Sequence, residues 1–160
     1  DSGQLVPDEL VTKIVKEKLQ AGTTDKGFFL DGYPRTVVQA KVLKEICRID
    51  MVLNLSASKK AIFERLMNRR TCKNCGAVYN VRSAPPKKVD ICDKCGSQLY
   101  KRSDETPDLV MRRLQVYEQA TKPLIDFYRN EDLLEDIDAN QEVDDVAAQC
   151  ESVLKEVGAR

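Results

Sequence analysis

The sequence predicts an α/β domain built on a mostly parallel sheet, with a small cysteine-rich unit inserted into it. Short apolar segments alternate along the chain with longer segments of helical periodicity, the order expected of parallel strands joined by helices. Residues 71–103 interrupt this order, because they have little helical periodicity and contain Pro85-Pro86. We therefore expect residues 1–70 and 104–160 to form the α/β core and residues 71–103 to form the insert.

The first three elements follow from local patterns. Pro7 to Gln20 predicts a helix because its apolar residues recur at helical spacing on one face, namely Leu10, Val11, Ile14, Val15 and Leu19. Gly27–Leu30 is a short, continuously apolar run bordered by turn residues, which favours a buried strand. A second helix is expected from Pro34 to about Ile46.

The remaining elements lie on both sides of the insert. Ile49–Leu55 is a second buried-strand candidate, followed by a helix that Ser58 caps and that runs to about Arg70. A long helix follows Pro107 and should kink or break at Pro123, since proline has no amide hydrogen to donate. A third strand is expected at 133–139. The last helix carries one apolar stripe: Val143, Val146, Ala147, Cys150, Val153, Leu154 and Val157.

Composition excludes several classes of function. The chain has 160 residues with 26 basic and 26 acidic side chains, so polyanion binding would need local clusters of charge. It has neither an apolar run of about 18 residues nor a signal region, so we expect no membrane partner. Histidine is absent, which removes Ser-His and Cys-His catalysis. Six cysteines, four of them in C-x-x-C pairs, favour metal binding in a reducing cytoplasm over disulfides.

The two cysteine pairs match the spacing of a zinc ribbon. Cys72 and Cys75 form one pair, Cys92 and Cys95 the other, and a glycine follows each pair. Four sulfur ligands close a tetrahedral shell and leave no position for water, so the site should be structural rather than catalytic. Zinc is favoured over iron. The alternatives are four unrelated buried cysteines or two disulfides.

A zinc ribbon also raises the alternative of a nucleic-acid-binding module. Lysines and arginines surround the insert, but the aromatic side chains that would stack on bases are few, namely Tyr79 and Tyr100. The zero net charge weakens this alternative further. A purely regulatory or structural fragment is a third possibility.

Arginines lie on both sides of the insert. Arg65 and Arg69 are four residues apart on the helix expected to enter it, so both should project from one face. Arg102 follows the insert, and Arg112 and Arg113 lie on the next helix. A single helical arginine is usually solvated. Planar guanidinium groups gathered at both ends of one unit suit the oxygens of a polyphosphate.

Two charged residues follow the first predicted strand. Arg35 lies near its carboxyl end, where open α/β sheets bind ligands. Asp31 directly follows the apolar run, as does the carboxylate that holds magnesium in many nucleotide-binding proteins. A helix cap or a turn residue would have the same appearance.

These motifs together resemble the adenylate kinase family, in its zinc-containing bacterial form. The resemblance runs through essentially the whole chain and rests on GQLVPDELV, FFLDGYPRTVVQA, ERLMNRRTCKNCGAVYNV and ICDKCGSQLYKRSDETPDLVMRRLQVYEQATKPLIDFY. It implies a P-loop kinase-like fold with helices on both faces of the sheet. It also implies reversible phosphoryl transfer from MgATP to AMP, giving two ADP, with the insert as a zinc-stabilised lid over ATP.

The resemblance also assigns roles to individual residues. Asp31 would hold magnesium through water, and Arg102 and Arg113 would contact both phosphates as the lid closes. ATP would be bound by Arg65, Arg69, Val78, Tyr79 and, through its backbone, Gln141. AMP would be bound by Gln4, Leu5, Val6, Gly32, Tyr33, Pro34, Arg35 and Gln39, with Arg35 on the phosphate and Gln39 on adenine.

The sequence departs from the family in one respect. No window fits the glycine-rich phosphate loop G-x-x-x-x-G-K-[ST]. The resemblance therefore implies an N-terminally truncated chain with an incomplete sheet, in which residues 1–21 are the remainder of the AMP-binding segment. We expect this chain by itself to be a monomer that does not turn over.

Overall fold

The computed structural model describes residues 4–21 and 27–158. The chain forms two compact units, one of residues 57–114 and the other of residues 4–56 with 115–160. Among the described residues, no helix is long and apolar enough to cross a membrane.

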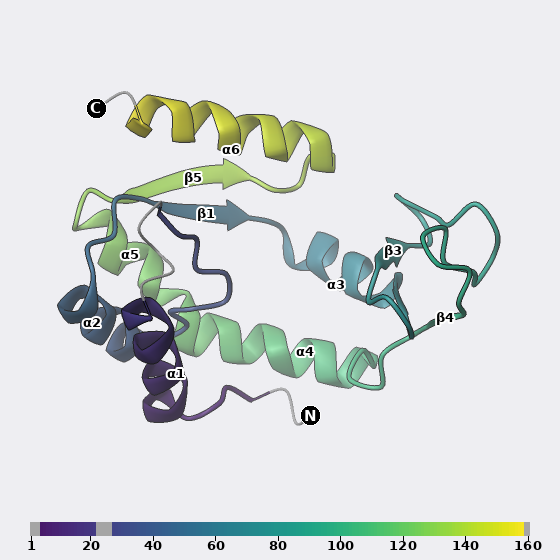
Figure 1. Ribbon diagram of the computed structural model, residues 1–160, viewed down its shortest axis with the longest axis horizontal. Helices are drawn as coiled ribbons and strands as arrows, with labels where there is room; N and C mark the ends of the chain where they lie inside the picture. Colours follow the sequence, from purple (N-terminus) through teal and green to yellow (C-terminus); the bar gives the residue numbers. More distant parts are fainter. Residues whose placement is uncertain (1–3, 22–26, 159–160) are drawn as a thin grey trace. The chain divides into compact units, whose positions relative to one another are not determined.

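The unit of residues 4–56 and 115–160 contains a parallel pair of strands. β1 (Val52–Ser56) pairs with β5 (Leu134–Asp138), and Val52 lies opposite Leu134. These strands confirm the predictions for 49–55 and 133–139, although Leu55 is exposed rather than buried. α6 (Val143–Gly158) lies along β5 on one side of the pair, whereas α5 (Pro123–Arg129) and α2 (Val37–Ile46) lie on the other (Figure 1). This is the α/β architecture that the sequence predicts.

The core of this unit lies between the strand pair and α2 and α5. Ala40, Leu124 and Tyr128 are buried there, and the partly buried Val52 and Leu134 pack against them. Successive residues of a strand point to opposite faces, so the odd-numbered Ile137 is buried on the other face of the strand pair. The sheet is therefore covered on both faces.

Both predicted helices in the first 46 residues are present. α1 (Asp8–Gln20) has two acidic residues in its first turn, which is favourable at the positive end of the helix dipole. α2 begins after Thr36, whose hydroxyl accepts a hydrogen bond from the amide of Gln39. This cap fixes the start of α2 three residues later than predicted.

The helix that follows the insert is interrupted near Pro123, as predicted. α4 (Pro107–Val116) continues into a π-helical turn, η1 (Tyr117–Thr121), and α5 then begins at Pro123. The amide of Lys122 donates to the carbonyl of Tyr117, five residues back. The π-helical turn ends the regular pattern of α4, so Pro123 stands in the first turn of a new helix, where proline is well tolerated.

The unit of residues 57–114 contains α3 (Lys59–Met67), part of α4 and a three-stranded antiparallel sheet. The hydroxyl of Ser58 accepts from the amide of Ala61, which confirms the predicted cap. β2 (Arg69–Cys72) is the central strand, with β3 (Val78–Asn80) on one side and β4 (Leu99–Tyr100) on the other.

One predicted strand is wrong. Gly27–Leu30 is not part of a strand, and Phe29 is 80% exposed. β1 pairs with β5, and no described strand pairs with 27–30. An apolar run becomes a strand only when a neighbouring strand accepts its backbone hydrogen bonds, so the apolar pattern was not sufficient.

Candidate functional site

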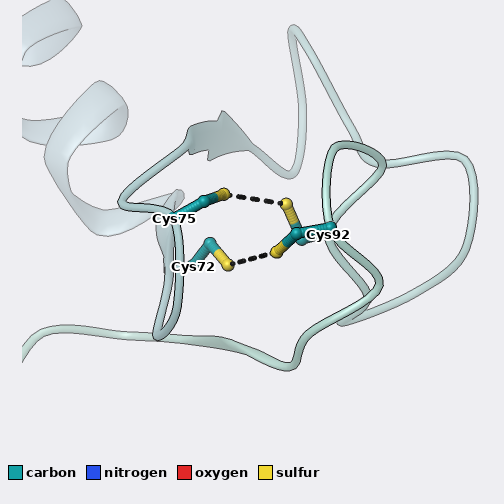
Figure 2. A group of neighbouring side chains, drawn as sticks. Cys72, Cys75 and Cys92 are labelled. Atoms are coloured by element: carbon teal, nitrogen blue, oxygen red, sulfur yellow. Dashed lines mark hydrogen bonds between the residues drawn. The ribbon is translucent and has the colours of Figure 1, made fainter.

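The four paired cysteines form one cluster. Their sulfur atoms all lie within 4.8 Å of one another, and Cys72 and Cys92 are buried whereas Cys75 and Cys95 are exposed. The sulfur atoms of Cys72 and Cys95 are 3.4 Å apart, and those of Cys75 and Cys92 are 3.6 Å apart. Figure 2 shows Cys72 and Cys75 on one turn with their sulfurs directed at the turn that carries Cys92.

These distances fit a metal ion better than disulfides. A disulfide brings its sulfurs to about 2.0 Å, whereas the edge of a tetrahedron with zinc–sulfur bonds of about 2.3 Å is close to 3.8 Å. None of the four cysteines forms a disulfide. The hydrogen bonds within the cluster divide the protons unequally: those from Ser97 lower the pKa of Cys95 to about 6, whereas the hydrogen bond with Cys95 raises the pKa of Cys75 to about 12. The donor set and its spacing therefore fit the predicted metal site.

The backbone shapes both halves of the cluster in the same way. The amides of Gly76 and Gly96 donate to the carbonyls of Cys72 and Cys92, at 3.2 and 2.9 Å. Both glycines have positive φ, 71° and 72°, a conformation that other residues rarely adopt. The glycine after each cysteine pair is thus what allows the turn to close.

A second cluster, in the same unit, joins arginines to two carboxylates. Arg69 Nε donates to Glu105 Oε1 at 2.6 Å, and a second nitrogen of Arg69 contacts the same oxygen. Glu105 is completely buried, and its other oxygen, Oε2, has no hydrogen-bond partner among the described residues. Arg102 Nε lies 3.9 Å from Glu105 Oε1.

Asp104 connects Arg102 to Arg113. Its two oxygens accept from Nε and Nη2 of Arg102, both at 2.9 Å, and Oδ2 also accepts from Nη2 of Arg113. The bidentate hydrogen bond from Arg102, with the contribution of Arg113, holds the pKa of Asp104 well below its usual range. Asp104 is therefore ionised at neutral pH, and the structure brings together Arg69, Arg102 and Arg113 around two carboxylates.

The expected placement of Arg69 is wrong. Arg65 is exposed on α3, but α3 ends at Met67, and Arg69 lies on β2 opposite Asn80. The two arginines therefore do not share a helix face. Pairing with β3 ends the helix earlier than its own residues predict, because the backbone of 69–71 is hydrogen-bonded across the sheet.

Asp104 and Glu105 were missed at the level of sequence. Adjacent acidic residues before a helix are usually solvated or act as caps, and nothing local shows that both are buried here. The available signal was their position between Arg102 and Arg113, because arginines gathered in one place need compensating negative charge.

A third group of polar residues lies in the unit of residues 4–56 and 115–160. Gln39 is 2% exposed; its Oε1 accepts from the amide of Arg35 and its Nε2 donates to Asp8, both at 2.7 Å. The hydroxyl of Thr36 donates to the other oxygen of Asp8 at 3.1 Å. The amide of Gln39 is therefore held in one orientation by α1 and by the chain before α2.

Arg35 is held against the turn that precedes it. Its Nε donates to the carbonyl of Gly32 at 2.8 Å, and a Cβ placed on Gly32 would lie 2.9 Å from the Arg35 guanidinium. Gly32 has a φ of 73°. Tyr33 is buried, with its hydroxyl 3.1 Å from that of Thr12, and is joined to Pro34 by a cis peptide bond. This turn requires glycine both for its backbone and for the close approach of the arginine.

The other candidate residues occupy varied positions. Gln4 and Val6 are exposed and Leu5 is half-buried in the segment before α1, while Asp31 is exposed after the 27–30 run. Val78 is exposed and Tyr79 half-buried on β3. Gln141 is half-buried before α6, and its Oε1 accepts from Gln149 at 3.1 Å. The roles assigned to these residues from the sequence stay predictions.

Comparison with known proteins identifies the family. The model of the family described as adenylate kinase matches residues 1–133. The adenylate kinase of Archaeoglobus fulgidus is 45% identical, with 98% of this chain aligned to 75% of that protein. The adenylate kinase of Bacillus licheniformis is also 45% identical, with 96% of this chain aligned to 73% of that protein. The adenylate kinase of Thermoanaerobacter pseudethanolicus is 44% identical over the whole of this chain and 75% of its own length. This chain is a member of the adenylate kinase family.

Proposed function

We propose that this chain takes part in reversible phosphoryl transfer from MgATP to AMP, giving two ADP. Its family membership supports a nucleoside monophosphate kinase. The observation that carries the proposal is the group of Arg69, Arg102 and Arg113 around Asp104 and Glu105. Phosphoryl transfer needs positioned cations more than a nucleophilic side chain, and a positioned arginine can contribute about 10³–10⁵ in rate. The absence of histidine from the sequence is compatible with this chemistry.

We assign the phosphates of ATP to the arginine group. Arg69, helped by Arg65, would bind the phosphates of ATP, and Arg102 and Arg113 would contact phosphates of both ATP and AMP. Val78, Tyr79 and the backbone of Gln141 would line the ATP site. Magnesium would enter with ATP and shield the charge of its phosphates, and Asp31 would contact it through water.

We assign AMP to the group that includes Arg35 and Gln39. The Arg35 guanidinium is exposed and held by the carbonyl of Gly32, so its outer nitrogens can bind a phosphate. Gln39 would read adenine; because its amide is buried and bonded to Asp8 and Arg35, AMP would have to take the place of part of these contacts. Gln4, Leu5, Val6, Tyr33 and Pro34 would complete the AMP site.

We assign zinc to the four cysteines as a structural ion. Residues 71–103 contain few buried apolar side chains, and the small apolar cluster there includes Cys72, Cys92 and Leu99. A unit with so little core commonly requires a metal to fold. The ion would be held entirely by sulfur, leaving the chemistry to the arginines. Thiolates remain available to a metal in a reducing compartment, which supports the expected cytoplasmic location.

Nucleotide binding tests the assignment directly. Calorimetric titration of AMP into the chain should show binding that Arg35→Ala weakens by about 10–100-fold, since a hydrogen bond to a charged group contributes about 1.5–3 kcal/mol. Arg48→Ala is the matched control, because Arg48 is highly exposed and pairs only with Asp50 among the described residues. No binding of AMP, or equal loss in both variants, would overturn the assignment.

The arginine group is tested in the same way with ATP. Arg69→Ala should weaken binding of MgATP, while AMP binding should be unchanged. Salt-sensitive binding of the chain to single-stranded nucleic acid, together with no binding of ATP or AMP, would contradict the proposed function.

A further inference from the structure

The side chain of Tyr79 packs against the cysteine cluster and comes from β3, the strand paired with the strand that carries Arg69 and Arg70. Tyr79 lies on β3, where it is opposite Arg70 of β2, and its neighbour Asn80 is opposite Arg69. Its ring packs against the buried Cys72, Cys92 and Leu99. The hydroxyl at the end of this ring therefore lies beside the sulfurs.

Two contacts define the surroundings of this hydroxyl. The amide of Asp93 donates to the oxygen of Tyr79 at 2.8 Å. The sulfur of Cys92 lies 3.4 Å from the same oxygen, within hydrogen-bonding distance for sulfur. An N–H group can only donate, so the Asp93 amide occupies a lone pair of the oxygen and leaves the hydroxyl hydrogen for an acceptor. The sulfur of Cys92 lies within reach of that hydrogen.

The two halves of the cluster differ at this point. In the half that contains Cys72, the amide of the following residue, Lys73, donates to the backbone carbonyl of Gln98 at 3.3 Å. In the half that contains Cys92, the amide of Asp93 donates instead to Tyr79. A side-chain hydroxyl thus takes the place of a backbone carbonyl. Unlike a carbonyl, it can also donate to the sulfur beside it.

We infer that the Tyr79 hydroxyl donates a hydrogen bond to the Cys92 thiolate when the cluster holds its metal, and that this bond positions the ligand. The inference rests on the proposed metal site. A metal-bound thiolate carries no hydrogen, so only the hydroxyl can donate between these two atoms. Groups that hydrogen-bond to metal ligands orient them and typically change metal affinity by about 10–100-fold. Tyr79 is therefore a positioning residue for the metal site.

Removal of one oxygen atom tests this inference. Tyr79→Phe keeps the ring that packs in the cluster and deletes only the hydroxyl. We expect it to bind zinc about 10–100-fold more weakly than the unaltered chain, measured by competition with a chromophoric chelator. Tyr100→Phe deletes the hydroxyl of another tyrosine in the same three-stranded sheet and should leave zinc affinity unchanged. Equal affinity of Tyr79→Phe and the unaltered chain would overturn the inference.

A spectroscopic measurement separates the hydrogen bond from a packing effect. In the cobalt-loaded chain, loss of a hydrogen bond to sulfur raises the energy of the sulfur electrons, so the sulfur-to-cobalt charge-transfer band of Tyr79→Phe should move to longer wavelength. Tyr100→Phe should leave the band in place. A weaker affinity without movement of the band would indicate packing alone and contradict the inference.

A measurement on the unaltered chain removes any dependence on how well the variants fold. With ¹¹³Cd in the cluster, the hydroxyl hydrogen of Tyr79 should show scalar coupling to cadmium through the Cys92 sulfur. A hydroxyl signal that is resolved but uncoupled would overturn the inference. Failure of the unaltered chain to bind zinc, cobalt or cadmium would instead overturn the proposed metal site itself.

Discussion

Asp104→Asn should destabilise the unit of residues 57–114 much more than the same change at an exposed aspartate. The Asp104 side chain is 7% exposed and accepts from both Arg102 and Arg113. Asparagine preserves its size but removes the negative charge and turns an amide NH₂ toward one of the guanidinium groups. The variant therefore loses hydrogen bonds and leaves two neighbouring arginines without their shared counter-charge.

The size of the loss follows from burial. Hydrogen bonds to charged groups contribute about 1.5–3 kcal/mol each, and removal of one partner of a fully buried pair costs about 3–5 kcal/mol. Arg102 and Arg113 are 47% and 32% exposed, so water screens part of the interaction. We therefore expect Asp104→Asn to lower the free energy of unfolding by about 2–4 kcal/mol at pH 7.

The loss should depend on pH in a defined direction. The pKa of Asp104 is lower in the folded chain than the value of about 3.9 expected in the unfolded chain. A lowered carboxylate pKa stabilises the folded state fully above the unfolded value, and this contribution disappears as pH falls through the folded pKa. The difference between the unaltered chain and Asp104→Asn should be constant from about pH 8 to 5 and should shrink below about pH 4.

Urea unfolding followed by circular dichroism at several pH values measures both effects. Asp126→Asn is the matched control, because Asp126 is 83% exposed and lies 3.4 Å from Arg129. Exposed pairs contribute about 0.2–1 kcal/mol, so the control should change little. A loss in Asp104→Asn no larger than in the control, or one that grows as the pH falls below about 4, would refute the reasoning.

Three further predictions concern the metal, the core and the Gly32 turn. Removal of metal with a chelator should lower the melting temperature, and added zinc should restore it; unchanged melting with no bound metal would contradict the zinc assignment. Leu43 of α2 is 1% exposed, so Leu43→Ala should lower the free energy of unfolding by about 2–5 kcal/mol, whereas Val38→Ala, at an exposed position of the same helix, should cost less than about 0.5 kcal/mol; similar losses would contradict the burial of Leu43. Gly32→Ala should displace the Arg35 guanidinium and weaken AMP binding measured by calorimetry, whereas Gly27→Ala, where a Cβ would contact nothing within 4 Å, should not; equal binding would contradict the role of the turn.

The features predictable from sequence are those whose cause is local. Ser58 caps α3 through its own hydroxyl, and Pro123 interrupts a helix because it lacks an amide hydrogen. The cysteine pairs predict a cluster because each pair, with its glycine, forms a compact turn with little help from the rest of the fold. For these residues, pattern and structure agree.

The features that the sequence did not predict depend on distant partners. The 27–30 run has the composition of a buried strand, yet without a paired neighbour among the described residues it forms no strand, and Phe29 is exposed. Arg69 continues a helical pattern, but hydrogen bonding of its strand to β3 takes precedence. The burial of Glu105 depends on Arg69, which lies 36 residues earlier. Such long-range pairs leave little signal in a single sequence.

In the proposed role of the arginine group, its acidic neighbours would assist the binding of an anion. Three guanidinium groups and two carboxylates leave one net positive charge, so the group still attracts phosphate. The hydrogen bonds to Asp104 use Nε and one terminal nitrogen of Arg102, and Glu105 contacts the corresponding edge of Arg69. The other terminal nitrogen of each arginine remains able to donate to a phosphate oxygen. Because a planar guanidinium held along one edge has little rotamer freedom left to lose, the carboxylates would reduce the entropic cost of the proposed phosphate binding while leaving donors for it.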